Sequence, residues 1–323
     1  MHRRGEHPSS ACNAGLQRKP GDSRGLPALR LIVCVALSMF AADRACAGDS
    51  RDLEIKVEGP TADAQRGVER FLVSSAAQQS ANAVEVLLPD SFGKDKDKRY
   101  RVIYVLPVET GTGGRYGDGM KEIRELNIHN KHDIICVYPT FDTLPWYADH
   151  LDHKHRRHAM YLKDVVVPLI EKRYPTMGKP EGRLLLGYSK SGWGAFALLL
   201  RHPDVFGGAA AWDSPFGYTD YTRWPKGWTD PFGSEEHFKL NCPMLLLAEH
   251  ARHFKDNPPR FALLGSANFK KDTAAMHEKM TAAGIPHIHD DTLNVKHDWH
   301  SGWVGPAVEH LMKLDKLSVK GDR

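Results

Sequence analysis

One short stretch of this sequence has the residue types of a nucleophilic catalytic turn. The segment "LLLGYSKSGWGAFALLL" places Ser189 between an apolar run and an alanine-rich run. A Gly-x-Ser-x-small turn between a strand and a helix lifts its serine above a sheet, provided that the residues two positions away are small. Around Ser189 these are Gly187 and Ser191, whereas around Ser191 one of them would be Trp193, which is too large. The sequence therefore predicts Ser189 as the nucleophile.

A serine hydroxyl needs a base, an acid that orients the base, and donors for the oxyanion. In this kind of fold the chain order is serine, acid, histidine. Two histidines follow in "VKHDWHSGW", His297 and His300, and either has the residue type of a general base. The backbone N–H of Lys190, directly after the nucleophile, is the expected oxyanion donor at the turn.

The elements that must position these groups alternate along the chain. A turn is expected at 75–82, and the residues that follow Ser189 begin a helix. Expected strands are 52–59, 83–89, 99–107, 132–141, 182–189, 205–212, 259–266 and 286–291, and expected helices are 162–174, 193–203, 242–254, 273–284 and 304–317. Strands that alternate with helices predict an α/β fold, with a mainly parallel sheet covered by helices on both faces.

The order and spacing of these motifs resemble the putative-esterase branch of the α/β-hydrolases, over roughly residues 83 to 315. That branch includes D-type esterases, feruloyl esterases, ferric-enterobactin-type esterases and the antigen 85 mycolyltransferases. The resemblance is carried by "VIYVLP", "PWYADH", "YLKDVVVPLIEKRYP", "GYSKSGWGAFALLLRHPDVFGGAAAW", "MHEKMTAAGIPHI" and "HDW". It implies an α/β-hydrolase fold and ester cleavage by a serine, with no metal and no organic cofactor.

The resemblance also assigns candidate residues. In this family the catalytic histidine is the first residue of a His-x-aromatic motif, which favours His297, the first residue of "HDW", over His300. Its second oxyanion donor follows a glycine after the strand "RVIYVLP". This chain has Val108 at the glycine position, so the implied donor is the backbone N–H of Glu109.

The acid departs from the pattern of the relatives. They carry Gly-x-x-Asp after the strand at 259–266, whereas this chain reads "GSAN", with Asn268 at the acid position. Asp272 lies four residues further along the same loop and is the first choice, although an aspartate there can also cap the next helix. Asp213, at the end of the preceding strand, is the second choice, and Glu249 is the third.

The amino-terminal 47 residues have the layout of a secretory signal peptide. A basic segment precedes the short apolar run "ALRLIVCVALSMFAA" and an Ala-x-Ala site that ends at Ala47. The alternative is an uncleaved anchor, for which the run is short. Residues 48–323 are then one mature α/β-hydrolase domain, secreted or periplasmic. The leader also contains the whole formal net charge of +4, so the mature chain has no basic excess that would suggest nucleic acid.

Three cysteines lie in the leader, and only Cys136 and Cys242 remain, both in apolar contexts. Two separately buried thiols are expected rather than one disulfide, although an oxidising compartment would allow a disulfide.

Aromatic residues suggest how a substrate is bound. The segment 214–240 is rich in Gly, Pro and aromatic residues and predicts an inserted lid. Trp146 and Tyr147, together with Trp224 and Trp228 of this lid, are candidates to stack on a sugar or an aromatic acyl group, or else to pack on one another.

Two further segments contain residue types that other kinds of site use. The glycine-rich stretch 109–119 does not match a nucleotide-binding pattern, because Tyr116 stands where the last glycine should be. A histidine-rich loop has metal-ligand types at close spacing, but without the order of a metallo-hydrolase, so polar surface is the preferred interpretation. Its members are Asp149, His150, Asp152, His153, His155 and His158.

The sequence thus predicts a serine esterase acting on a small-molecule or glycan ester, for instance an acylated carbohydrate. An acyltransferase of the same fold is the nearest alternative. From a different class, a carbohydrate-binding relative with an incomplete triad would keep the aromatic lid.

Overall fold

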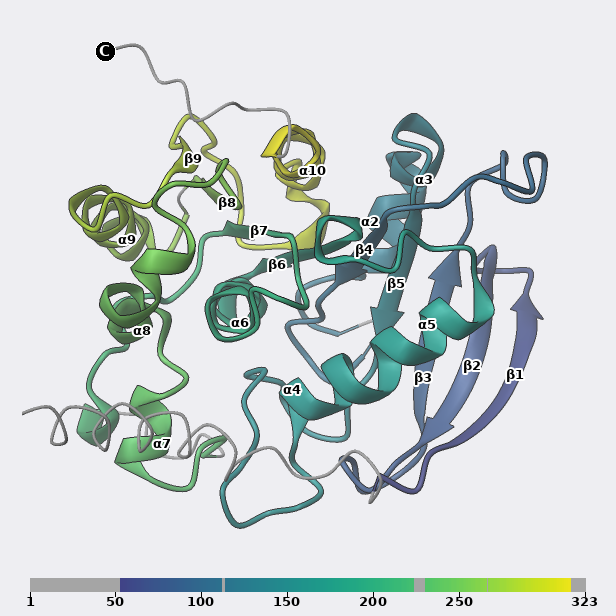
Figure 1. The fold of residues 1–323 in the computed structure, drawn as a ribbon, viewed down its shortest axis with the longest axis horizontal. Coiled ribbons are helices and arrows are strands. Elements are labelled where there is room, and N and C mark those ends of the chain that lie inside the picture. Colours follow the sequence, from purple (N-terminus) through teal and green to yellow (C-terminus); the bar gives the residue numbers. More distant parts are fainter. Residues whose placement is uncertain (1–52, 112–113, 224–229, 266, 315–323) are drawn as a thin grey trace, which may run out of the picture. The chain divides into compact units, whose positions relative to one another are not determined.

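The computed structural model describes residues 53–111, 114–223, 230–265 and 267–314. In this part of the chain, nine strands form a sheet in the order β1-β2-β3-β5-β4-β6-β7-β8-β9 (Figure 1). Neighbouring strands from β1 to β5 along this order are antiparallel, and those from β5 to β9 are parallel. The strands are β1 Lys56–Asp63, β2 Val68–Ser74, β3 Asn82–Leu87, β4 Val102–Val105, β5 Ile135–Pro139, β6 Arg183–Tyr188, β7 Gly208–Trp212, β8 Phe261–Leu264 and β9 His287–Asp290.

Helices cover both faces of the sheet and divide its core into two apolar clusters. One cluster contains residues of α4, α5, α6, α8 and α9, and the other contains residues of α2, α3 and α10. The helices are α2 Gly119–Glu125, α3 Ile128–Lys131, α4 His158–Met160, α5 Val167–Arg173, α6 Ser189–Arg201, α7 Glu235–Lys239, α8 Pro243–His250, α9 Lys270–Ala282 and α10 Val304–Lys313. A π-helical stretch, Tyr161–Val166, joins α4 to α5.

The central strands are buried on both sides, which explains their continuous apolar sequences. In β6, Leu185 packs into the cluster with α6, whereas Leu184 and Leu186 pack into the cluster with α10. Successive side chains of a strand point to opposite faces, so a strand covered on both faces must be apolar throughout. The predicted α/β architecture, with a mainly parallel sheet and helices on both faces, is confirmed.

The amino-terminal edge of the sheet differs from the prediction. Two strands were expected before residue 90, but the structure has three, because "VERFLVS" forms β2 between β1 and β3. Its outward positions include Leu72, which is 40 % exposed, so the segment lacks the clean alternation that would have marked it as a strand. The ambiguous segment 242–254 begins with helix α8, as predicted.

The predicted lid is only partly described. Residues 214–223 form turns and a short 3₁₀ segment, Tyr221–Arg223, and the segment ends in the helix α7, which was not expected. Cys136 and Cys242 are both free and buried, as predicted. The signal peptide, and with it the boundary of the mature domain, lies outside the described residues and stays a prediction. No helix in the described ranges combines the length and apolarity needed to cross a membrane.

Candidate active site

The predicted nucleophile lies at the carboxyl end of the central strand β6. Ser189 is the first residue of α6 and has a φ of +51°, in the left-handed region that residues other than glycine rarely adopt. A Cβ at Gly187 would lie 2.5 Å from the backbone of Ser191, so only glycine fits two residues before Ser189. Such a conformation persists where the surrounding structure enforces it, often at functional sites.

The two serines of this turn have different surroundings. Ser191 is fully buried, and its hydroxyl donates to the Tyr188 carbonyl at 2.9 Å and accepts from the Tyr188 N–H at 3.0 Å. Ser189 is 8 % exposed, and its hydroxyl has no hydrogen bond to any described residue. Of the two, Ser189 has the hydroxyl that is free to react.

The carboxylate that binds His297 belongs to Asp213. The Nδ1 atom of His297 lies 2.6 Å from Oδ2 of Asp213, which is fully buried at the end of β7. Tyr188 and Trp212 are register partners, so Ser189 and Asp213 each follow a paired strand end. Asp213 also has a positive φ, of +43°.

Three backbone N–H groups hold the Asp213 carboxylate in its ionised form. Those of Ala267 and Phe269 donate to Oδ1 at 2.9 and 2.7 Å, and that of Asn268 donates to Oδ2 at 2.9 Å. Burial alone would raise the pKa of Asp213, but the hydrogen bonds from His297 and from these backbone groups outweigh burial and lower that pKa. A charged carboxylate on Nδ1 keeps the ring proton there and leaves Nε2 as the nitrogen that can accept a proton.

The choice of Asp272 as the acid was therefore wrong. Asp272 lies in the first turn of α9 and accepts the backbone N–H of Gly217 at 2.8 Å. Asn268, at the acid position of the relatives, has an exposed side chain and contributes its backbone N–H instead. Glu249 is exposed on helix α8. The second choice, Asp213, is the residue that reaches the histidine.

Aromatic rings surround the imidazole of His297. Their centroids lie 5.0 Å away for Tyr188, 5.7 Å for Tyr116, 5.7 Å for Phe269 and 6.1 Å for Trp212. Tyr188 and Trp212 are fully buried, whereas Tyr116 and Phe269 are half-buried. The contact between Tyr188 and His297 places the imidazole beside the residue that precedes Ser189. Sequence reasoning missed Tyr116 and Phe269, because each is a single aromatic residue in a loop.

The two predicted oxyanion donors lie on neighbouring strand ends. Lys190 is in the first turn of α6, where backbone N–H groups lack partners within the helix. Glu109 follows β4, whose extension is joined to β6 by the hydrogen bond from Leu106 N to Leu186 O, 2.8 Å. The Glu109 carboxylate packs against Gly114, where a Cβ would collide with it. The Lys190 side chain is half-buried, and burial lowers its pKa, although Glu109 nearby has the opposite effect.

Two of the four aromatic candidates are not available to a ligand. Trp146 and Tyr147 are 2 % and 0 % exposed. Trp146 packs edge-on against Trp193, and the Tyr147 hydroxyl donates to the Pro107 carbonyl at 2.7 Å. Their predicted stacking on substrate is therefore wrong, because both rings are part of the core. Trp224 and Trp228 lie outside the described residues.

Two histidines of the histidine-rich loop have ring nitrogens that bond to other groups of the protein. Nδ1 of His150 accepts the backbone N–H groups of Asp152 and His153, at 3.1 and 3.2 Å. His158 is buried, and its Nε2 lies 3.0 Å from the Thr143 hydroxyl. These bonds agree with the interpretation as a polar loop that leads into a helix.

Comparisons with known proteins place this arrangement in a family. No curated protein matches the sequence. Solved structures share the fold. A ferulic acid esterase matches with 17 % identity over 82 % of this chain and 98 % of that chain, with a TM-score of 0.56. A fluorophosphonate-binding serine hydrolase F of Staphylococcus aureus matches with 16 % identity over 74 % of this chain and 94 % of that chain, with a TM-score of 0.58. An S-formylglutathione hydrolase of Agrobacterium tumefaciens matches with 15 % identity over 79 % of this chain and 95 % of that chain, with a TM-score of 0.54. The profile of the family described as "Putative esterase" matches residues 75–305. The chain therefore belongs to this family, and it is a carboxylic ester hydrolase.

Proposed function

We propose that the protein cleaves a carboxylic ester through an acyl-serine intermediate, with Ser189, His297 and Asp213 as the catalytic triad. The observation that carries the proposal is the 2.6 Å bond between His297 and a buried aspartate, on the strand next to the one that ends at Ser189. This bond gives the imidazole the tautomer that a general base requires.

In the proposed reaction, His297 Nε2 takes the hydroxyl proton of Ser189 while Oγ attacks the ester carbonyl carbon. The backbone N–H groups of Lys190 and Glu109 stabilise the resulting oxyanion. When the tetrahedral intermediate collapses, His297 returns the proton to the leaving alkoxide, and an acyl-serine remains. Water, deprotonated by the same nitrogen, then attacks the acyl carbon, and His297 returns this proton to Ser189 Oγ as the bond from Oγ to the acyl carbon breaks and the carboxylic acid leaves.

The substrate-contacting aromatic residues of this proposal are Tyr116 and Phe269. Both are half-buried and lie edge-on to the ring of His297, beside which the leaving group must pass. They replace Trp146 and Tyr147 in this role.

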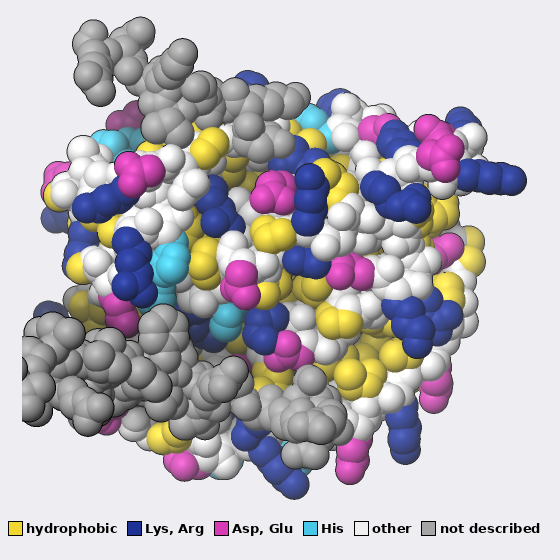
Figure 2. Space-filling model, in the orientation of Figure 1, with side chains coloured by type: hydrophobic (Ala, Val, Ile, Leu, Met, Phe, Trp, Pro, Cys, Tyr) yellow, Lys and Arg dark blue, Asp and Glu magenta, His cyan; other side chains and the backbone are white. Residues whose placement is uncertain are grey.

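The proposed substrate is a small-molecule or glycan ester. The proposed location, outside the cytoplasm, rests on the signal peptide that the sequence predicts at residues 1–47. Basic and acidic side chains are interspersed over the face in Figure 2.

A fluorophosphonate probe tests the proposal. It should label wild-type protein at Ser189, and Ser189→Ala should lose both the label and the hydrolysis of 4-nitrophenyl acetate while keeping its thermal unfolding temperature. Folded wild-type protein that takes no label would favour the binding-only relative. Added sugar alcohols distinguish the acyltransferase: acylated sugar in the mass spectrum, at the expense of free acid, would identify transfer rather than hydrolysis.

A further inference from the structure

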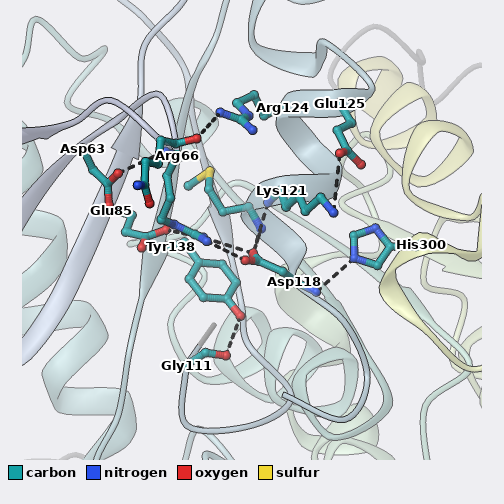
Figure 3. Close-up of polar contacts among 12 residues, drawn as sticks. Asp63, Arg66, Glu85, Gly111, Asp118, Lys121, Arg124, Glu125, Tyr138 and His300 are labelled. Atoms are coloured by element: carbon teal, nitrogen blue, oxygen red, sulfur yellow. Dashed lines mark hydrogen bonds and ion pairs between the residues drawn. The ribbon is translucent and has the colours of Figure 1, made fainter. Parts of the chain in front are cut away.

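The second histidine of "HDWH" has a carboxylate partner of its own. His300 Nδ1 lies 2.6 Å from Oε2 of Glu122, whose side chain is 9 % exposed. The other ring nitrogen, Nε2, lies 3.2 Å from the backbone nitrogen of Asp118. Figure 3 shows the His300 ring directed at the backbone of Asp118, the residue before helix α2.

These two partners define the protonation state of the ring. A backbone N–H can only donate, so Nε2 must present its lone pair, and the ring proton must be on Nδ1, where it is donated to Glu122. The same bonds argue against a metal ion, although Glu122, Glu125 and His300 offer ligand atoms within 4.8 Å of one another. A metal on Nδ1 would leave the ring proton on Nε2, where it would face the Asp118 N–H.

Asp118 is firmly anchored to the sheet. Its carboxylate accepts the backbone N–H groups of Met120 and Lys121 at the start of α2, at 3.0 and 3.1 Å. It also accepts two hydrogen bonds from Arg66, at 2.8 and 3.2 Å, and Arg66 in turn binds Glu85 of β3 at 2.8 Å (Figure 3). The group that donates to His300 is therefore held on a fixed support.

The turn before Asp118 contacts the proposed catalytic base. The Tyr116 carbonyl accepts the backbone N–H of Trp299 at 3.0 Å, and the Tyr116 ring lies edge-on to His297. Gly117 packs so closely on His300 that a Cβ there would lie 2.7 Å from the ring. Two hydrogen bonds thus join the turn 116–118 to the segment 297–300, at Trp299 and His300, two and three residues after His297.

We propose that His300 is a positioning residue for the esterase reaction. Its neutral ring, oriented by Glu122, accepts the Asp118 N–H and holds the turn 116–118 against the loop that carries His297. This inference rests on the proposed role of His297 as the base. A loss of this bond lets the loop shift, which lowers the rate of the chemical step more than the binding of substrate, because small displacements of catalytic groups are costly.

The test compares two substitutions of His300 in the full chain. His300→Ala removes both bonds and should lower kcat on 4-nitrophenyl acetate about five- to tenfold, with KM within about twofold. His300→Gln should restore most of kcat, since its amide oxygen can accept from Asp118 while its amide nitrogen donates to Glu122. His310→Gln is the matched control, because His310 is a half-buried histidine paired with Asp290 at 2.8 Å on the far edge of the sheet.

Glu122→Ala provides a second route, which is also informative if His300→Ala does not fold. It should lower kcat as His300→Ala does, and the double variant should be no worse than either single variant. The inference would be overturned if His300→Ala kept the kcat of wild type or changed only KM. It would also be overturned if His300→Ala and His300→Gln lost kcat equally, or if the losses of kcat in His300→Ala and Glu122→Ala added in the double variant. Full activity in Ser189→Ala would instead refute the proposed function, whatever His300 does.

Discussion

Replacing Asp213 by asparagine should stop the reaction with little change in shape. The carboxylate receives four donors: His297 Nδ1 and the Asn268 N–H at Oδ2, and the Ala267 and Phe269 N–H groups at Oδ1. An amide has one oxygen and can satisfy only two of them. The better orientation keeps the oxygen on the two backbone donors at Oδ1, which places the NH₂ group against His297.

The expected magnitude follows from this geometry. An NH₂ group can only donate, so Nδ1 of His297 must become an acceptor and its proton must move to Nε2, the atom that should deprotonate Ser189. A wrong tautomer of this kind costs on the order of 10⁴ in kcat, which is about 5 kcal/mol of barrier. The Asn268 N–H is also left facing a donor, which should lower the free energy of unfolding by about 1–3 kcal/mol.

Steady-state hydrolysis of 4-nitrophenyl acetate, together with urea unfolding, measures both effects. Asp272→Asn is the matched control, because the asparagine can still accept the Gly217 N–H, and its kcat should stay within about threefold of wild type. A kcat above a tenth of wild type in Asp213→Asn, or an equal loss in Asp272→Asn, would refute the assignment of the acid. Adding Asn268→Asp to Asp213→Asn should not restore kcat, since residue 268 presents its backbone to the site.

Three further predictions concern the turn at Ser189, the reactivity of the two thiols and the dependence of stability on pH. Gly187→Ala should lower kcat at least tenfold and reduce the melting temperature measured by circular dichroism, because its Cβ would lie 2.5 Å from the backbone of Ser191. Burial raises the pKa of the Cys242 thiol to about 11 and also raises the pKa of Cys136, so mass spectrometry should find iodoacetamide on neither thiol at pH 8 and on both in urea. Because folding lowers the pKa of Asp213, its contribution to stability is fully present above its unfolded pKa of about 4 and is lost as the pH falls through its lower folded pKa. The free energies of urea unfolding of wild type and Asp213→Asn should therefore converge as the pH falls through that range.

The parts of the site that could be predicted are those that local sequence determines. The turn between strand and helix at Ser189 is one, because its geometry depends on residues within two positions of Ser189. The direction of a side chain in an irregular loop depends on distant packing. For that reason Trp146 and Tyr147 were expected to face the substrate, whereas they fill the core beneath α6. The same limit explains why β2, with an exposed leucine on its outer face, was missed.

The carboxylate that binds His297 could not be predicted, because two neighbouring strand ends can each supply one. β7 and β8 are paired up to Trp212 and Leu264, so Asp213 and the loop of Asn268 begin side by side. The resemblance predicts a carboxylate on the loop after β8, whereas in the structure that loop donates three backbone N–H groups to the carboxylate that follows β7. The side chain of Asn268 is exposed, and only its backbone N–H reaches the Asp213 carboxylate. A carboxylate on the side chain of residue 268 is therefore not needed in the proposed triad, in which the loop after β8 supplies donors and the end of β7 supplies the acid.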